Sequence, residues 1–288
     1  MNVRPATADD VPALAAILAA NHEPMDWPDL PDLGWPYLEH LVARARTSVA
    51  ETDGVVVGFG GSVTVGREGL RFVTDLFVDP AHHERGAGRA LLADVVEDAP
   101  ERMTFSSKDE RALALYVRAG MRPWWPLLYL EIPAGALDGG GRNVGDAALT
   151  TVPADVGETT RWSRTWTGVD RSVDFEHYAS LPEATGFVVH DAGAVAAVGW
   201  ARRERKRADG RWLDHASLAP DADPVRAALA VLRAAAAGGR LVAPVPGPHP
   251  ALARLLDLGA RIGGRDQFCA TDPGLIDPER ILPNPGFV

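Results

Sequence analysis

Apolar side chains recur at helical spacing near the start of the chain. Residues 11–18 carry them three and four positions apart, directly after Thr7 and Asp10, which imitate a capping box. We therefore expect a helix there and another over residues 37–46. The residues between, 21–36, are rich in proline, tryptophan and acid, and the pattern predicts a loop.

The pattern then changes to that of strands. Two apolar runs, residues 48–52 and 55–65, flank Asp53-Gly54, a dipeptide that is typical of a tight hairpin turn. The remaining elements expected in the first half are a strand over 72–80, a helix over 89–99, a strand over 103–106, a helix over 109–121 and a closing strand over 124–132.

A glycine loop joins the strand over 72–80 to the helix that follows. Gly86 and Gly88 allow a tight turn that exposes several N–H groups at a helix start, where they can hold a pyrophosphate. A dinucleotide fingerprint would need a third glycine where Leu91 stands, and a Walker loop would need Gly-Lys-Ser/Thr. An ordinary glycine-rich turn remains the alternative.

The residues from His83 to Gly88, His-Glu-Arg-Gly-Ala-Gly, resemble the acyl-CoA loop of the GNAT acyltransferase superfamily, [Q/R]-x-x-G-x-[G/A], with histidine at the first position. A later segment, residues 109–121, resembles the family helix N-x-x-A-x-x-L-Y-x-[RK]-x-G-[FM], with Asp109 in place of asparagine. The tyrosine of that helix is Tyr116. The opening residues, 3–10, also resemble the start of a GNAT domain.

The resemblance implies acetyl-CoA as co-substrate and assigns its site. Backbone N–H groups around Arg85–Ala90 would hold the pyrophosphate, and an N–H near Val78 would polarise the thioester carbonyl. The residues expected to bind the cofactor are Phe77, Val78, His83, Arg85, Gly86, Ala87, Gly88, Arg89 and Ala90. No CxxC pair or histidine cluster suggests a metal.

In the family, the tyrosine at the position of Tyr116 protonates the departing thiolate; the alternative is a core tyrosine whose hydroxyl bonds to backbone. For the general base, Asp75 is the first candidate, because it lies on the strand where family members often place a base. Glu23, His22 and an ordered water are rivals. Asp214, at the equivalent position of an internal repeat, counts against Asp75, since a purely structural aspartate would also recur.

That repeat has a constant offset of 139 positions, which pairs Gly54 with Gly193 and Gly120 with Gly259. At this offset Gly86 falls on Val225, Gly88 on Ala227, Arg85 on Pro224 and Tyr116 on Leu255. The second copy should therefore not bind CoA in the same way, because it lacks the glycines and the hydroxyl.

We thus expect an α/β (α+β) fold with two GNAT-like domains, each a mixed, mostly antiparallel curved sheet flanked by helices. The first, residues 1–135, would bind acyl-CoA where two parallel strands splay apart, and would carry the catalysis. Residues 136–160 would form a linker, and residues 161–288 a degenerate GNAT-like domain.

Composition and net charge limit the classes of molecule that the protein is expected to bind. The chain has 288 residues, of which 46% are apolar and 24% charged, as in ordinary globular proteins. A net charge of −10 argues against nucleic acid and mildly favours a cationic substrate. A single cysteine, Cys269, and the lack of a signal or a membrane span lead us to expect a cytoplasmic protein; a homodimer is one arrangement open to it.

Substrate choice is expected in the 21–36 loop, through Glu23, Asp26, Trp27 and Trp35, which could attract and face a cationic amine. A proline-stiffened surface loop with core tryptophans is an equal alternative. Three functions stay open: an N-acetyltransferase that acts on a small amine by direct attack on the thioester, a protein-amine acetyltransferase, and a non-catalytic CoA-binding sensor or pseudo-enzyme.

Overall fold

The computed structural model describes residues 1–21, 30–66, 68–83, 85–107, 109–138, 149–204 and 210–287, without the side chains of residues 30–35. The chain divides into two compact units. Unit 1 comprises Met1–Trp124, Phe268–Pro273 and Gly286–Val288. Unit 2 comprises Trp125–Gln267 and Gly274–Pro285.

Unit 1 is a sheet covered by helices on both faces. Its strands are β1 (Asn2–Pro5), β2 (Arg46–Thr52), β3 (Val55–Thr64), β4 (Leu70–Val78), β5 (Glu101–Ser106) and the first residues of β6 (Arg122–Ile132). Its helices are α1 (Val11–Ala20), α2 (Leu30–Arg44), α3 (Ala87–Val95) and α4 (Glu110–Arg118), with short 3-10 turns at Ala8–Asp10 and Pro80–His82. The strands follow one another from β1 to β5, and the end of β12 lies beside β5.

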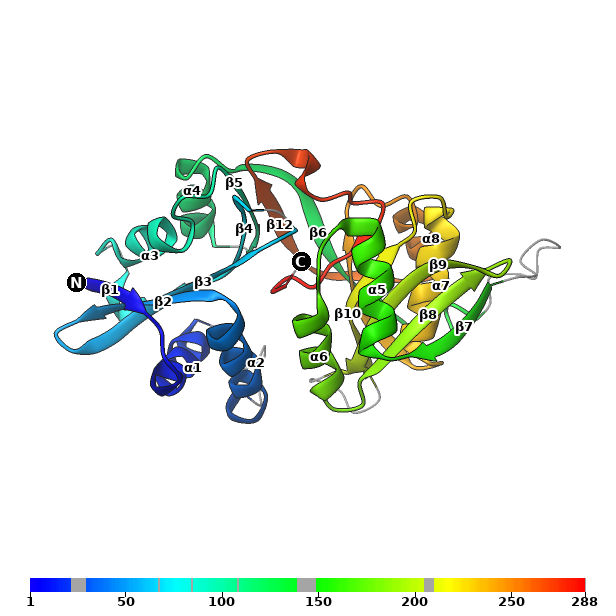
Figure 1. Ribbon diagram of the computed structural model, residues 1–288, viewed down its shortest axis with the longest axis horizontal. Helices are drawn as coiled ribbons and strands as arrows, with labels where there is room; N and C mark the ends of the chain where they lie inside the picture. Colours follow the sequence, from blue (N-terminus) through cyan, green and yellow to red (C-terminus); the bar gives the residue numbers. More distant parts are fainter. Residues whose placement is uncertain are drawn as a thin grey trace. The chain divides into compact units, whose positions relative to one another are not determined.

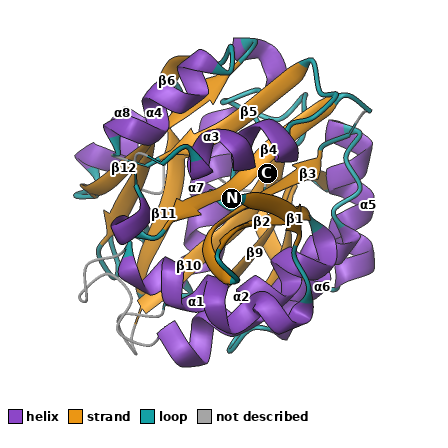
Figure 2. Ribbon diagram, turned by 90° about the vertical axis from the view of Figure 1, so that its left-hand side faces the viewer, coloured by secondary structure: helices purple, strands orange, loops and turns teal. Residues whose placement is uncertain are grey.

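The strands β1 to β4 pair antiparallel, whereas β4 and β5 are parallel. Helices α3 and α4 lie on one face of this sheet and α1 and α2 on the other (Figure 1 and Figure 2). Two apolar clusters hold α3 and α4 to the sheet, one around Leu91 and Val57, the other around Leu92, Tyr116 and Cys269. The glycine loop, which leads into α3, is therefore held on the face of the sheet that α3 and α4 cover.

Unit 2 repeats this plan. Its strands are β7 (Leu149–Ala154), β8 (Thr185–Asp191), β9 (Ala194–Arg203), β10 (Gly210–Leu218), β11 (Arg240–Pro246), most of β6 and of β12 (Arg261–Ala270), and β13 (Ile281–Leu282). Its helices are α5 (Val156–Thr167), α6 (Ser172–Ser180), α7 (Pro224–Ala236) and α8 (Leu252–Asp257), with a 3-10 turn at Pro273–Leu275. One large apolar cluster lies between α7 and the sheet.

The offset of 139 positions is visible in the elements themselves. The hairpin of β2 and β3 recurs, at that offset, as the hairpin of β8 and β9. Both turns use two residues with positive φ, Asp53-Gly54 in unit 1 and Ala192-Gly193 in unit 2. The parallel pair of β4 and β5 likewise has a counterpart in β10 and β11. Unit 2 is thus a second copy of the fold of unit 1.

Three expectations need correction. The segment 21–36 is not all loop, because α2 begins at Leu30. A helix tolerates a proline in its first turn. Pro36, inside the helix, is the residue that made the sequence resemble a loop. The expected linker, 136–160, contains β7, which pairs with β8 and so belongs to the sheet of unit 2. Finally, unit 1 ends at Trp124 rather than at residue 135, and it takes up Phe268–Pro273.

Candidate active site

The loop between β4 and α3 ends in an open helix N-terminus. Gly86 is the N-cap of α3, with a φ of +87°, which glycine adopts without strain. A Cβ built on Gly86 would meet nothing described within 4 Å, so the space beside it is open. The first N–H groups of a helix have no acceptor within it, and those of Ala87, Gly88 and Arg89 can therefore bind an anion.

Gly88 is glycine for a different reason, which is close packing. A Cβ there would approach Leu115 Cδ1 to 3.2 Å and Val78 Cγ2 to 3.7 Å. The start of α3 is thus pressed against α4 and the end of β4. Of the residues expected to bind the cofactor, Arg85, Gly86 and Arg89 are exposed, Ala87 is buried, and Phe77, Val78, His83, Gly88 and Ala90 are partly buried. The structure brings all nine to one place; their roles stay predictions.

β4 and β5 separate partway along their length. They pair in parallel only over Leu70–Phe72 of β4. Among the described residues no further strand pairs with that edge, although β4 continues to Val78 and β5 to Ser106. Thr104 Oγ1 bridges the start of the separation by donating to the Val73 carbonyl at 2.8 Å. The splayed parallel strands that the resemblance implied are therefore present in unit 1.

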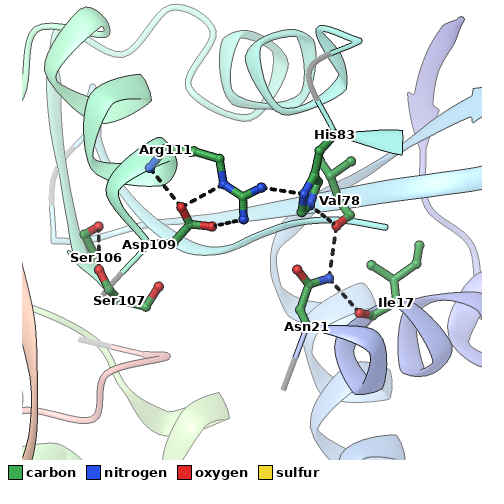
Figure 3. A network of polar contacts seen from close by, with 8 residues as sticks. All are labelled: Ile17, Asn21, Val78, His83, Ser106, Ser107, Asp109 and Arg111. Carbon is green, nitrogen blue, oxygen red and sulfur yellow. Dashed lines mark hydrogen bonds and ion pairs between the residues drawn. The ribbon is translucent and has the colours of Figure 1, made fainter. Parts of the chain in front are cut away.

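The backbone of Val78 faces this open edge. Asp79 N–H donates to the Val57 carbonyl at 2.9 Å, and the alternation of an antiparallel pair then turns the N–H and the carbonyl of Val78 to the opposite side. That carbonyl accepts hydrogen bonds from Asn21 Nδ2 at 3.0 Å and from His83 Nε2 at 2.9 Å (Figure 3). These contacts hold the Val78–Asp79 peptide group. The Val78 N–H belongs to the preceding peptide group and faces the same edge through the antiparallel pairing of β4 with β3.

The two departures from the family motifs are joined by Arg111. Its NH1 donates to His83 Nδ1 at 2.6 Å, and its Nε and NH2 donate to Asp109 at 3.0 and 2.8 Å (Figure 3). Because a guanidinium can only donate, His83 Nδ1 accepts from Arg111, and Nε2 donates to the Val78 carbonyl. Hydrogen bonding by Arg111 lowers the pKa of Asp109. No sequence motif marked Arg111, since it occupies a variable position of the family helix.

Tyr116 projects from α4 into a buried cluster with Val73, Leu92 and Cys269. Burial is the main cause that raises its pKa, and a hydrogen bond with the Thr104 side chain opposes that rise. The phenol thus stays protonated over the physiological range, as a proton donor must before it acts. Its hydroxyl meets a side chain rather than backbone, and its catalytic role stays a prediction.

Asp75 is buried on β4 and is held by a residue that the sequence pattern did not single out. Tyr37, from α2, donates its hydroxyl to Asp75 Oδ2 at 2.6 Å. Burial raises the pKa of Asp75 to about 6, and the hydrogen bonds from Tyr37 and Thr74 limit the rise. The charge of Asp75 raises the pKa of Tyr116 further, so the two groups lie close enough to interact. A carboxyl with this pKa can accept a proton near neutral pH.

Asp214 stands at the equivalent position of unit 2 in a different environment. Arg202 Nε donates to Asp214 Oδ1 at 3.0 Å, and both side chains are largely buried. Asp214 is therefore half of an ion pair, whereas the hydrogen bonds that influence Asp75 come from hydroxyl groups. The two aspartates thus occupy equivalent positions but differ in their partners: an arginine for Asp214 and hydroxyl groups for Asp75.

In unit 2, a side chain of the chain itself fills the position that corresponds to the anion site of unit 1. Asp223 caps α7, and its carboxylate accepts the N–H of Arg226 at 2.9 Å. Pro224 follows at the first helical position and has no N–H to donate. Leu255, which is fully buried, stands where unit 1 has Tyr116. A side-chain carboxylate therefore takes the place that an anionic ligand could take in unit 1.

The gap between the parallel strands of unit 2 is also filled. β10 and β11 pair over Gly210–Trp212 only. Beyond that point β13 pairs with β10 through Ser217 and Ala216, and it also lies against β11. The Leu218 N–H donates to the Arg280 carbonyl at 2.9 Å just before β13. In unit 2, β13 thus pairs with the edge of β10 that corresponds to the open edge of β4 in unit 1.

The residues expected to contact the substrate lie before and within the first turns of α2. Glu23, Asp26 and Trp27 lie outside the described residues, as does the rival base His22. Trp35 lies in α2, where its side chain is not described.

Among the described residues, histidine, cysteine, aspartate and glutamate form no group of three that could hold a metal ion. In the same part of the chain, no helix is long and apolar enough to cross a bilayer.

Comparison with known proteins agrees with this geometry. Residues 14–121 match the acetyltransferase (GNAT) family, whereas no curated protein matches the chain. The structure of a Pyrococcus horikoshii protein that is described as an acetyltransferase is similar to this one, with a TM-score of 0.71 and 14% sequence identity. The match covers 98% of this chain and 93% of the Pyrococcus chain. A GCN5-related N-acetyltransferase of Anabaena variabilis has a TM-score of 0.63 at 13% identity, over 93% and 72%.

A tandem GNAT protein from the clavulanic acid biosynthesis pathway has a TM-score of 0.59 at 16% identity, over 94% of this chain and 99% of its own. At such identities these likenesses show the fold. The family match covers the strand edge, the glycine loop and Tyr116. Residues 14–121 thus match the acetyltransferase (GNAT) family, and the fold of the chain is shared over nearly its whole length with a tandem GNAT protein.

Proposed function

We propose that the protein is an acetyl-CoA-dependent N-acetyltransferase that acts on the amine of a small molecule, with direct attack of the amine on the thioester. The observation that carries the proposal is one strand, β4. Its free edge ends beside the open N-terminus of α3, and it bears a buried carboxyl, Asp75, within electrostatic reach of Tyr116. A cofactor site, a base and an acid thus lie around one strand.

The residues around the loop fit a cofactor with an anionic pyrophosphate and an extended amide-bearing arm. The N-terminus of α3 offers N–H groups and a positive dipole end, and Arg85 and Arg89 are exposed nearby. The free edge of β4 offers N–H and carbonyl groups to amides. When bound, acetyl-CoA supplies the acetyl group as a thioester.

The chain's own residues supply the proton transfers. Asp75 accepts a proton from the attacking amine, directly or through a water, and Tyr116 donates one to the departing sulfur. The Val78 N–H, which faces the open edge of β4, stabilises the negative charge that develops on the carbonyl oxygen. The new C–N bond replaces the C–S bond, and both protons are accounted for.

Two features of the chain support a small cationic amine as acceptor. The net charge is −10, and the segment 21–36 carries four acidic residues in a stretch that family members commonly use to cover the acceptor. One active site per chain follows from the filled strand edge and the capped α7 of unit 2.

A binding experiment tests the location of the site. Isothermal titration of CoA into the full chain should give one site per chain. Arg89→Glu, beside the loop, should weaken binding at least tenfold, and Arg254→Glu, the same charge change on the exposed face of α8, should not. Equal effects of the two substitutions, or two sites per chain, would contradict the placement in unit 1.

A turnover experiment tests the reaction. Free-thiol release from acetyl-CoA is followed with polyamines, amino sugars, amino acids and lysine peptides as acceptors. Turnover with small amines and not with peptides supports the proposal. Turnover with peptides alone would make the enzyme a protein acetyltransferase. CoA binding without any turnover would favour the sensor.

A further inference from the structure

We propose that Phe287, far from the GNAT segment in sequence, together with Tyr37 positions Asp75 for proton transfer. The inference rests on the proposed function, because it concerns the same carboxyl. It adds a residue that the family match does not include, since that match ends at residue 121 and Phe287 follows it by more than half the chain.

The argument begins with Tyr37, the residue that holds Asp75. A 2.6 Å hydrogen bond from a phenol fixes which carboxyl oxygen Tyr37 engages and so restrains the orientation of the carboxyl. A phenol can hold that geometry only if its ring is itself held, because rotation about the side-chain bonds would otherwise move the hydroxyl away.

Phe287 provides that support. Its ring is 1% exposed and meets the Tyr37 ring edge to face, with centroids 5.6 Å apart and an interplanar angle of 61°. It meets the His40 ring, one helical turn further along α2, at 5.0 Å and 73°. Phe287 therefore packs against two successive turns of α2 on the side from which Tyr37 reaches β4. Aromatic pairs of this kind prefer defined angles, so the contact restrains the Tyr37 ring.

The segment that carries Phe287 belongs to unit 1, although the residues before it belong to unit 2. Gly286 and Phe287 thus act as part of the fold of the first unit. The titratable groups that face this assembly are Tyr37 and His40 from α2 and Tyr116 from α4, with Cys269 of β12 beside Tyr116. A change at Phe287 should reach Asp75 through Tyr37 and not through a new charge.

The test measures the Asp75 carboxyl directly, by ¹³C NMR titration of labelled aspartate, with Asp75→Asn to assign the signal. The Tyr37 hydroxyl favours the ionised carboxyl, so Tyr37→Phe should move the titration midpoint upward, by roughly one pH unit for the loss of a charged hydrogen bond. Phe287→Ala should move it in the same direction by a smaller amount, and Phe287→Leu, which keeps apolar bulk, should move it less still.

The double variant decides whether the two residues act in series. In the Tyr37→Phe background, Phe287→Ala should add no further movement. Phe175→Ala in unit 2, another fully buried phenylalanine, controls for general loosening and should leave the midpoint unchanged. Additive effects, or an unmoved midpoint in Phe287→Ala, would overturn the inference.

The outcome is separable from that of the proposed function. If the midpoint moves as expected but no amine is acetylated, the positioning stands and the acetyltransferase proposal fails. If amines are acetylated while the midpoint ignores Tyr37 and Phe287, the function stands and the inference fails. In an active enzyme the acidic limb of the kcat profile should follow the NMR midpoint in each variant.

Discussion

Arg111 NH1 lies 2.6 Å from His83 Nδ1, and this contact ties the start of α4 to the loop that leads into α3. Each of the two side chains makes a further hydrogen-bond contact: Arg111 donates to Asp109, and His83 donates to the Val78 carbonyl. The two positions that differ from the family motifs are therefore joined through one arginine. Together they hold the peptide that faces the open edge of β4.

Arg111→Ala should weaken CoA binding about three- to tenfold, because the imidazole that orients Val78 loses one hydrogen bond of about 1 kcal/mol. The free energy of unfolding should change by less than about 0.5 kcal/mol, since the guanidinium is largely exposed. Titration calorimetry and urea denaturation measure the two quantities. Arg118→Ala, at the other end of α4, is the control; equal CoA affinities in both variants would count against the role of Arg111.

Gly86 offers a test of charge at matched size. Asparagine and aspartate both tolerate positive φ, but only aspartate places a negative charge at the N-terminus of α3. Gly86→Asp should weaken CoA binding at least tenfold more than Gly86→Asn, because its carboxylate competes as Asp223 does at the start of α7. Calorimetry at 50 and 500 mM salt measures the difference, which should shrink as salt rises. Equal affinities would argue that no anion binds there.

Tyr116→Phe should lower kcat about 10- to 100-fold and leave the affinity for CoA unchanged, because the hydroxyl is needed for protonation of the departing sulfur. Tyr178→Phe removes the hydroxyl of another buried tyrosine, in unit 2, and should leave kcat unaffected. Stopped-flow thiol release measures both variants. A Tyr116→Phe enzyme with normal kcat would make Tyr116 a core residue.

Asp75 should make the protein less stable as pH rises. Its pKa in the folded state, about 6, exceeds the ordinary value of 3.8, so the native state binds more protons between these limits. The contribution of Asp75 to the free energy of unfolding should therefore fall across this window, by at most about 3 kcal/mol. The buried His215 and His249, whose pKa values are lowered, contribute in the opposite direction, so the difference between wild type and Asp75→Asn isolates the carboxyl. Asp75→Asn should remove that slope and be the more stable protein at pH 8 while losing activity.

Denaturation at pH 4.5, 6 and 8 measures this dependence, and Asp214→Asn is the matched comparison. Asp214 is paired with a largely buried arginine, so its loss should destabilise unit 2 by about 3 kcal/mol. A difference in stability between wild type and Asp75→Asn that does not change between pH 4.5 and 8 would contradict the buried, raised pKa of Asp75.

Several elements could be predicted from local signals. The Asp53-Gly54 turn, the strand that leads to Gly86 and the helix that carries Tyr116 follow from turn chemistry and periodicity, which act between residues close in sequence. The start of α2 at Leu30 could not, because its prolines and acidic residues carry the composition of a loop. β7 was likewise hidden in a segment of weak periodicity.

The sequence by itself determined that the chain carries one strand–loop–helix with glycines suited to an anion, and a second copy without them, since both depend on residue types at short spacing. Only the tertiary structure decided what surrounds them. Tyr37 on Asp75, Arg111 on His83, β13 on the edge of β10 and Phe287 against α2 are contacts between residues far apart in the chain. No local pattern encodes such pairs, because they depend on how the packed helices and strands bring distant side chains together.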